Sequence, residues 1–95
     1  MGAQELIELF SKKGVLSARP RTELLELIVD GYAHVLALDV NRRRLEREIA
    51  QLAQSGEPHA KDLRGLSAQL TEVTSLSDRL RGLLDELRAR EARGA

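Results

Sequence analysis

The sequence predicts an all-α fold, in which a short N-terminal helix precedes a long antiparallel helical hairpin of the coiled-coil kind. Leucine, alanine, arginine and glutamate dominate the 95 residues, and these residue types favour helices. Two long segments repeat apolar residues in steps of three and four, the spacing of a coiled-coil seam. Both repeats fit one antiparallel register. We therefore expect a single helical domain over residues 1–95, and we expect two copies of it to form a four-helix bundle.

The first predicted helix covers residues 3–13. Its apolar cluster consists of Leu6, Ile7, Leu9 and Phe10. Lys12 and Lys13 suit the C-terminal end of a helix, where the helix dipole favours cations, and Gly14 can follow as the residue that ends it. A helix of this length is only marginally stable alone, so we expect it to dock on the rest of the chain.

The second predicted helix covers residues 20–54, a turn covers 55–57, and the third helix covers 58–92. Pro20 fits the first turn of the second helix, because its fixed φ is helical and its missing N–H is not needed there. Gly56 and Pro58 then close one helix and open the next. The last residues, 93–95, are expected to fray.

The apolar seam of the hairpin fixes its register. The predicted seam consists of Ile28, Tyr32, Val35, Leu38, Leu45, Ile49 and Leu52 on the second helix, and of Leu63, Leu66, Leu70, Val73, Leu80, Leu84 and Leu87 on the third. The same register places Gly31 opposite Leu84, and Gly65 opposite Ala50. A glycine inside a helix costs about 1 kcal/mol relative to alanine. Either close backbone approach or drift at exposed sites accounts for these two glycines.

A second apolar stripe on the second helix predicts a partner. The predicted interface consists of Leu25, Val29, Ala33, Leu36 and Val40, together with Thr71 and Thr74 from a face of small side chains on the third helix. The seam and this stripe together make a wide apolar surface around the second helix, and in water such a surface must be covered by another element. We expect Leu6, Leu9 and Phe10 of the first helix to cover part of it, and a second copy of the chain to cover the rest.

An arginine cluster on the second helix is a possible docking patch. It consists of Arg42, Arg43, Arg44 and Arg47. Arginine forks suit phosphate oxygens, but Glu46 and Glu48 lie four residues from Arg42 and Arg44, the spacing of ion pairs along a helix. No aromatic side chain lies nearby to stack a base. We expect a self-paired solvated face and regard nucleic acid as an unlikely partner. Arg42 takes a seam position, where it either reaches outward or fixes the register.

One group of side chains is a possible metal site. Asp30 and His34 lie four residues apart, and the register brings Asp85 near them. Two carboxylates and a histidine can hold a metal, but Arg81 is expected opposite His34 and favours a salt bridge instead. We therefore expect neither a metal nor a cofactor. No arrangement of a nucleophile with an activating base is apparent either, so we expect no enzyme.

Composition and charge argue against several other classes of protein. Basic and acidic residues number 15 each, so no net charge draws the chain to nucleic acid or to a membrane surface. Cysteine is absent, which excludes disulfides and thiol chemistry. The longest uncharged run, 31–38, is too short to cross a bilayer, and residues 1–10 lack the basic start of a signal peptide. A cytoplasmic location is the default expectation.

These observations predict a non-enzymatic protein–protein interaction module. Its expected form is a homodimeric helical adaptor or regulator that docks on a larger protein. Two alternatives remain open. One is a transcription-linked regulator, either anti-sigma-like or a DNA-associated dimer, and the other is a self-assembling structural coiled-coil protein.

Overall fold

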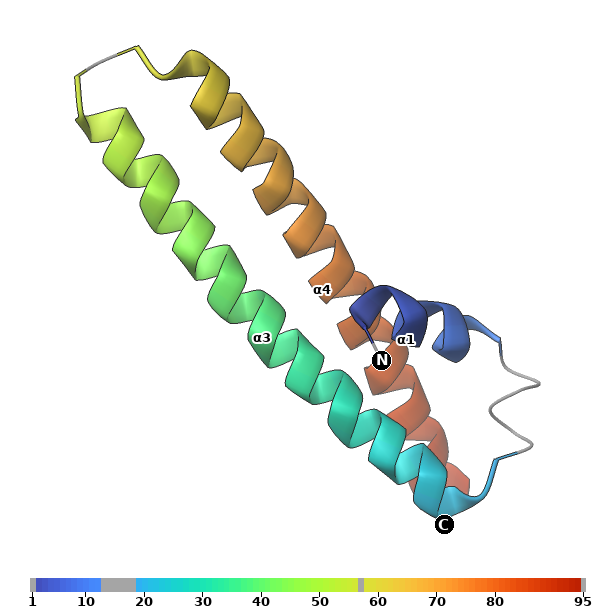
Figure 1. Ribbon diagram of the computed structural model, residues 1–95. Coiled ribbons are helices and arrows are strands. Elements are labelled where there is room, and N and C mark those ends of the chain that lie inside the picture. Colours follow the sequence, from blue (N-terminus) through green and yellow to red (C-terminus); the bar gives the residue numbers. More distant parts are fainter. Residues whose placement is uncertain (1, 13–18, 57, 95) are drawn as a thin grey trace.

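The computed structural model describes residues 2–12, 19–56 and 58–94, and this part of the chain forms three helices and no strand. They are α1 (Ala3–Ser11), α3 (Arg21–Gln54) and α4 (Ala60–Gly94). Figure 1 shows α3 and α4 as a long antiparallel hairpin, with α1 beside its open half. The molecule measures 57 × 19 × 18 Å. The predicted all-α fold and the predicted hairpin are confirmed.

Local chemistry explains where the helices end. α1 ends at Ser11, two residues before the predicted end, and the Ser11 hydroxyl donates to the carbonyl of Ile7 (2.7 Å). The predicted roles of residues 13 and 14 lie outside the described residues, as does most of the connector. α3 begins directly after Pro20, whose carbonyl accepts from the backbone N–H of Leu24 (3.1 Å). Pro20 is thus the residue before the first turn, with a φ of -58° and an extended ψ of 148°, and α3 begins one residue later than predicted.

The turn between the long helices differs slightly from the prediction. Gly56 has a φ of 75°, a left-handed conformation that glycine adopts without steric cost. α4 begins at Ala60 rather than at Pro58, because the backbone N–H of Leu63 donates to the carbonyl of His59 (2.8 Å) and the first helical turn starts there. At its other end α4 continues to residue 94, two residues beyond the predicted end at 92.

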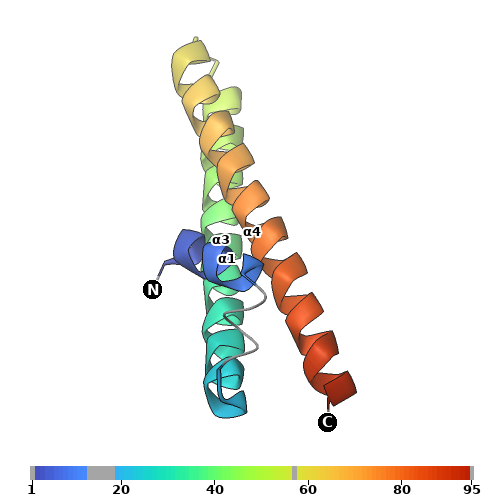
Figure 2. The same cartoon turned by 90° about the vertical axis from the view of Figure 1, so that its right-hand side faces the viewer.

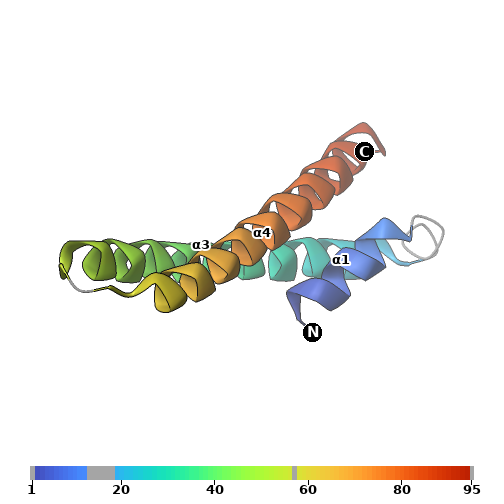
Figure 3. The same cartoon turned by 90° about the horizontal axis from the view of Figure 1, so that it is seen from above.

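The main core lies in the half of the hairpin away from the turn. All of the predicted seam residues are buried or half-buried. The continuous core consists of Leu6, Ile7, Phe10, Ile28, Val35, Leu80, Leu84 and Leu87. Figures 2 and 3 show that α3 and α4 cross and diverge away from the turn. α1 contacts both helices in that open half, so its apolar cluster fills the space that the divergence creates.

Contacts across the hairpin agree with the predicted register at Gly31. A Cβ atom on Gly31 would lie 2.5 Å from Cδ2 of Leu84, so a side chain here would displace Leu84 or push the two helices apart. Gly65 has no atom within 4 Å of such a Cβ, so close approach does not explain that glycine. Two polar contacts also join the helices: the hydroxyl of Tyr32 donates to Oδ1 of Asp85 (2.8 Å), and Arg21 pairs with Glu91 (2.9 Å).

The position of α1 determines which part of the wide apolar arc of α3 is covered. Its side chains share a core with Leu24 and Leu27 of that arc and with Leu76 and Leu83 of α4. The physical reason is the divergence of the long helices, which would expose seam leucines of α4 if α1 lay elsewhere. Leu80 and Leu84 are fully buried in this arrangement. The second stripe is left uncovered.

Candidate protein-interaction face

The uncovered stripe of α3 is the candidate functional site. Leu25 is 45% exposed, Val29 and Leu36 are each 68% exposed, and Val40 is 66% exposed. At 3.6 residues per turn they share one side of α3, roughly 100° around the helix from Ile28 of the seam. Ala33 lies between them and is also exposed. We call these five residues, Leu25, Val29, Ala33, Leu36 and Val40, the α3 stripe.

The α3 stripe lies on the opposite side of the hairpin from α1. Leu27 packs with the core that contains α1, and it lies roughly 100° from Ile28 in the other direction around α3. Two of the predicted interface residues come from α4. Thr74 is half-buried, while Thr71 is exposed and its hydroxyl donates to the backbone carbonyl of Ser67 (3.0 Å). One face of the molecule is thus closed by α1, and the other presents the stripe.

The acidic end of the stripe lies near the start of α3. A shallow hollow of about 300 Å³ is lined there by Thr22, Leu25, Glu26, Val29 and Asp30. Neither Glu26 nor Asp30 forms an ion pair within residues 2–12, 19–56 and 58–94. Both carboxylates are therefore available to a cation on a partner.

The basic end of the stripe lies beyond Val40. A second shallow hollow, of about 570 Å³, is lined there by Val40, Arg43, Glu46, Arg47 and Ala50. Arg47 has no ion-pair partner among the described residues. Carboxylates therefore lie beside the first half of the stripe, and Arg43, Glu46 and Arg47 lie beyond its last residue. Glu26 is not among the residues that the sequence pattern singles out, and Asp30 is considered there only as a possible metal ligand.

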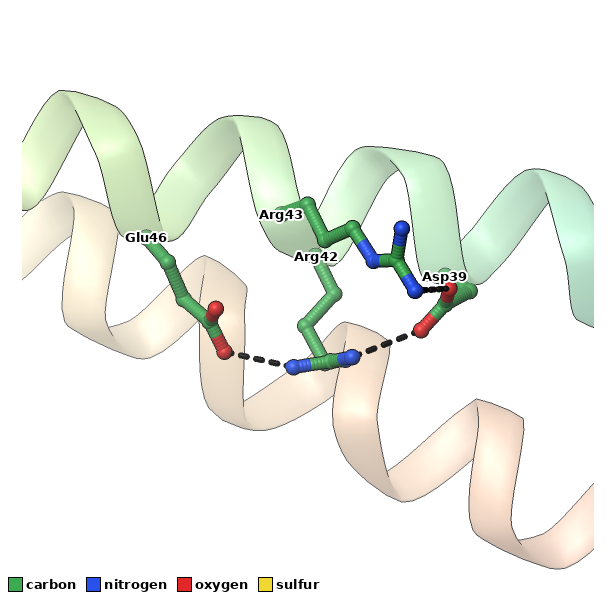
Figure 4. A network of polar contacts seen from close by, with 4 residues as sticks. All are labelled: Asp39, Arg42, Arg43 and Glu46. Atoms are coloured by element: carbon green, nitrogen blue, oxygen red, sulfur yellow. Dashed lines mark hydrogen bonds and ion pairs between the residues drawn. The ribbon is translucent and has the colours of Figure 1, made fainter.

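Most of the predicted arginine patch is paired along α3. Figure 4 shows Arg42 between Asp39 and Glu46, at 2.6 Å from a carboxylate oxygen of each, while Arg43 holds the other oxygen of Asp39 at 3.1 Å. Arg44 lies 3.8 Å from a carboxylate oxygen of Glu48. Arg42 is about one-third exposed at its seam position, with its guanidinium held by these two carboxylates, and the pairs offset much of the positive charge that a phosphate group would require.

This network changes two protonation equilibria. The hydrogen bond from Arg42 is the largest cause that lowers the pKa of Asp39, and the charges of Arg43, Arg42 and Arg81 lower it further. Hydrogen bonds to Asp39 and then to Glu46 raise the pKa of Arg42. Both groups are held in their charged forms at neutral pH. The pairing stabilises a helical turn and leaves neither group poised to exchange a proton.

The structure does not place Asp30, His34 and Asp85 as a metal site. Within the described ranges, no group of three or more histidine, cysteine, aspartate or glutamate residues could hold a metal ion. Asp85 instead accepts a hydrogen bond from Tyr32. The expected salt bridge between Arg81 and His34 is absent among the described residues, and the charge of Arg81 acts on Asp39 instead.

Comparisons with other proteins add no relative. No protein-family model, curated protein or solved structure was found to match this chain. In the part of the chain that the structure describes, every helix falls short of the combination of length and apolar character needed to cross a membrane.

Proposed function

We propose that this protein is a non-enzymatic protein–protein interaction module that pairs with a second copy of itself through the α3 stripe. The observation that carries the proposal is the exposure of Val29, Leu36 and Val40, each about two-thirds open to solvent. Burial of apolar surface contributes about 25 cal/mol per Å², so a row of such side chains favours association. Rows of exposed apolar residues are a common mark of interaction sites.

The shape of the stripe favours another helix as the occupant. Leu25 and Val40 lie 15 residues apart, or about 22 Å along a straight helix. Side chains at helical spacing pack into the grooves of a second helix. A second copy supplies such a helix with no further sequence requirement, because a twofold interface uses one patch twice. Two hairpins joined in this way would form a four-helix core.

The dimer would act as an adaptor or regulator through the half of the hairpin near the turn. That half carries the paired arginines of α3 and the turn at Gly56, and the α3 stripe ends before it. Charged exposed helical surfaces provide specificity and faster association with a larger protein. The absence of an enzymatic role remains part of the proposal, supported by the open, shallow form of the hollows along the stripe.

Sedimentation equilibrium over a range of concentrations tests the proposal. The chain has a mass of 10.6 kDa, so we expect twice that mass at micromolar concentration. Leu36→Glu should return the protein to a monomer with unchanged helix content, because its side chain is exposed in the single copy. Gln69→Glu adds the same charge to an exposed site on α4, on another side of the helix from Thr71, and should leave the dimer intact. A wild-type protein that stays monomeric at every concentration would refute self-pairing.

A further inference from the structure

The groove between α3 and α4 that α1 occupies has the form of a helix-binding site. The long helices diverge away from the turn (Figures 2 and 3), and α1 places Leu6, Ile7 and Phe10 between them, each at most 3% exposed. Their spacing puts these three side chains on one side of a helix. Docking of the apolar side of an amphipathic helix into an apolar groove is a common mode of binding between proteins.

Apolar side chains account for the described contacts between α1 and the hairpin. In the part of the chain that the structure describes, no hydrogen bond or ion pair joins α1 to α3 or α4. α1 has nine residues, and its N-cap, Gly2, provides no side-chain hydrogen bond. A helix this short is only marginally stable alone. Because Tyr32 pairs with Asp85 and Arg21 with Glu91 across the hairpin, the long helices have contacts that persist when α1 undocks.

α1 does not fill the groove at its C-terminal end. A hollow of about 210 Å³ lies beside Phe10, Ser11, Leu83 and Arg90. A second hollow, of about 310 Å³, lies beside Ser11, Gly82 and Leu83, and a Cβ atom on Gly82 would meet no atom within 4 Å. Leu83 is only half-buried between them. The groove therefore has room for a longer helix, or for a larger side chain at the position of Ser11.

We propose that this groove is a docking site for an amphipathic helix of a partner protein, and that α1 is an internal occupant which the partner displaces. The partner helix carries two adjacent aliphatic side chains and an aromatic one three residues later, as α1 does, with a further apolar side chain at the position of Ser11. When the partner is absent, α1 keeps Leu80 and Leu84 covered. The groove lies on the other side of the hairpin from the α3 stripe, so its use does not require self-pairing.

Fluorescence anisotropy of a labelled peptide with the sequence of residues 2–12 tests the groove. The full-length protein carries Leu36→Glu throughout, so that the α3 stripe is blocked. Adding Phe10→Ala to the protein weakens the docking of its own α1 and should lower the peptide Kd about tenfold or more, because a larger fraction of the protein has an open groove. A peptide with Leu6→Ala and Phe10→Ala should not bind. A Glu8→Gln peptide, changed on the exposed side of α1, should bind like the original.

Two further measurements test the unfilled space and the displacement. A Ser11→Leu peptide should bind about threefold or more tighter than the original, because it buries apolar surface in the hollows. A Glu8→Leu peptide adds the same side chain on the exposed side and should gain little. The chain contains no cysteine, so Glu8→Cys gives one spin-labelled site on α1 of the full-length protein. That label should become more mobile as the Ser11→Leu peptide saturates the groove.

The outcomes separate this proposal from self-pairing. Equal peptide affinity with and without Phe10→Ala, or binding that leaves the label at position 8 unchanged, would place the peptide elsewhere and overturn the proposal. A protein that keeps its hairpin by circular dichroism and binds no peptide would also overturn it. Ile7→Ala provides a second variant with weakened docking, in case Phe10→Ala disturbs the hairpin. Sedimentation of the wild-type protein tests self-pairing and is independent of all these results.

Discussion

Replacing Gly31 with alanine tests the closest approach of α3 to α4. The added Cβ would lie 2.5 Å from Cδ2, 3.0 Å from Cδ1 and 3.2 Å from Cγ of Leu84. Turning the two terminal methyl groups cannot relieve all three contacts, because Cγ is among them. Leu84 is fully buried in the core, so either its side chain must leave its packed position or the helices must separate.

The expected magnitude follows from a matched glycine. Overpacking of a well-packed core costs about 1–3 kcal/mol, while alanine in place of glycine stabilises a helix by about 1 kcal/mol. Gly65 lies inside α4 and a Cβ there meets no atom within 4 Å, so Gly65→Ala should show the helix gain alone. Because that gain is common to both variants, Gly31→Ala should be less stable than Gly65→Ala by about 1–3 kcal/mol.

Urea unfolding followed by circular dichroism measures this difference, at one protein concentration so that association affects each variant alike. Leu84→Ala removes all three contacting atoms. In that background Gly31→Ala should lose its penalty and resemble Gly65→Ala. Equal stabilisation by Gly31→Ala and Gly65→Ala in the wild-type background would refute the close approach of the helices at Gly31.

Three further predictions concern the contacts that shape the monomer. Phe10→Ala should remove about 3–5 kcal/mol of packing and undock α1 while the hairpin persists, seen as loss of amide-exchange protection in α1 alone. Tyr32→Phe should cost about 0.5–1.5 kcal/mol, because the hydrogen bond to Asp85 is lost, and an unchanged urea midpoint would contradict this. The pKa of Asp39 is lowered from 3.8, chiefly by Arg42, so its contribution is present above pH 3.8 and disappears as the pH falls through the lower folded value. Asp39→Asn should therefore flatten the acid side of the plot of melting temperature against pH.

The helix limits and the hairpin register were within reach of sequence reasoning because their causes are local. Pro20 and Gly56 act through their own backbone preferences, and a tight turn transmits the register to the whole seam. The contact between Gly31 and Leu84 followed from that register. The exposure of Leu36 was also predictable, since one seam cannot bury a residue so far around the helix.

The remaining errors come from geometry that no periodicity encodes. A register pairs residues along the hairpin but does not give the crossing angle, so it could not separate the close approach at Gly31 from the open space at Gly65. The crossing also decides where α1 docks, because it opens a site beside Leu83 that the sequence pattern does not reveal. The sequence pattern also does not show that Tyr32 reaches Asp85 across the hairpin.

The position of α1 bears on which assembly the proposed pairing would produce. A hairpin with apolar surface on both sides could add copies without limit, as a structural coiled-coil protein would. α1 buries Leu80 and Leu84 on one side, which leaves the α3 stripe as the apolar row on the other. In the proposed pairing the stripe of each copy is covered once two copies meet, because a twofold interface closes on itself. The same docking that stabilises the monomer therefore favours a closed dimer over a filament, and Phe10→Ala, by undocking α1, should convert the dimer to larger assemblies that grow with concentration.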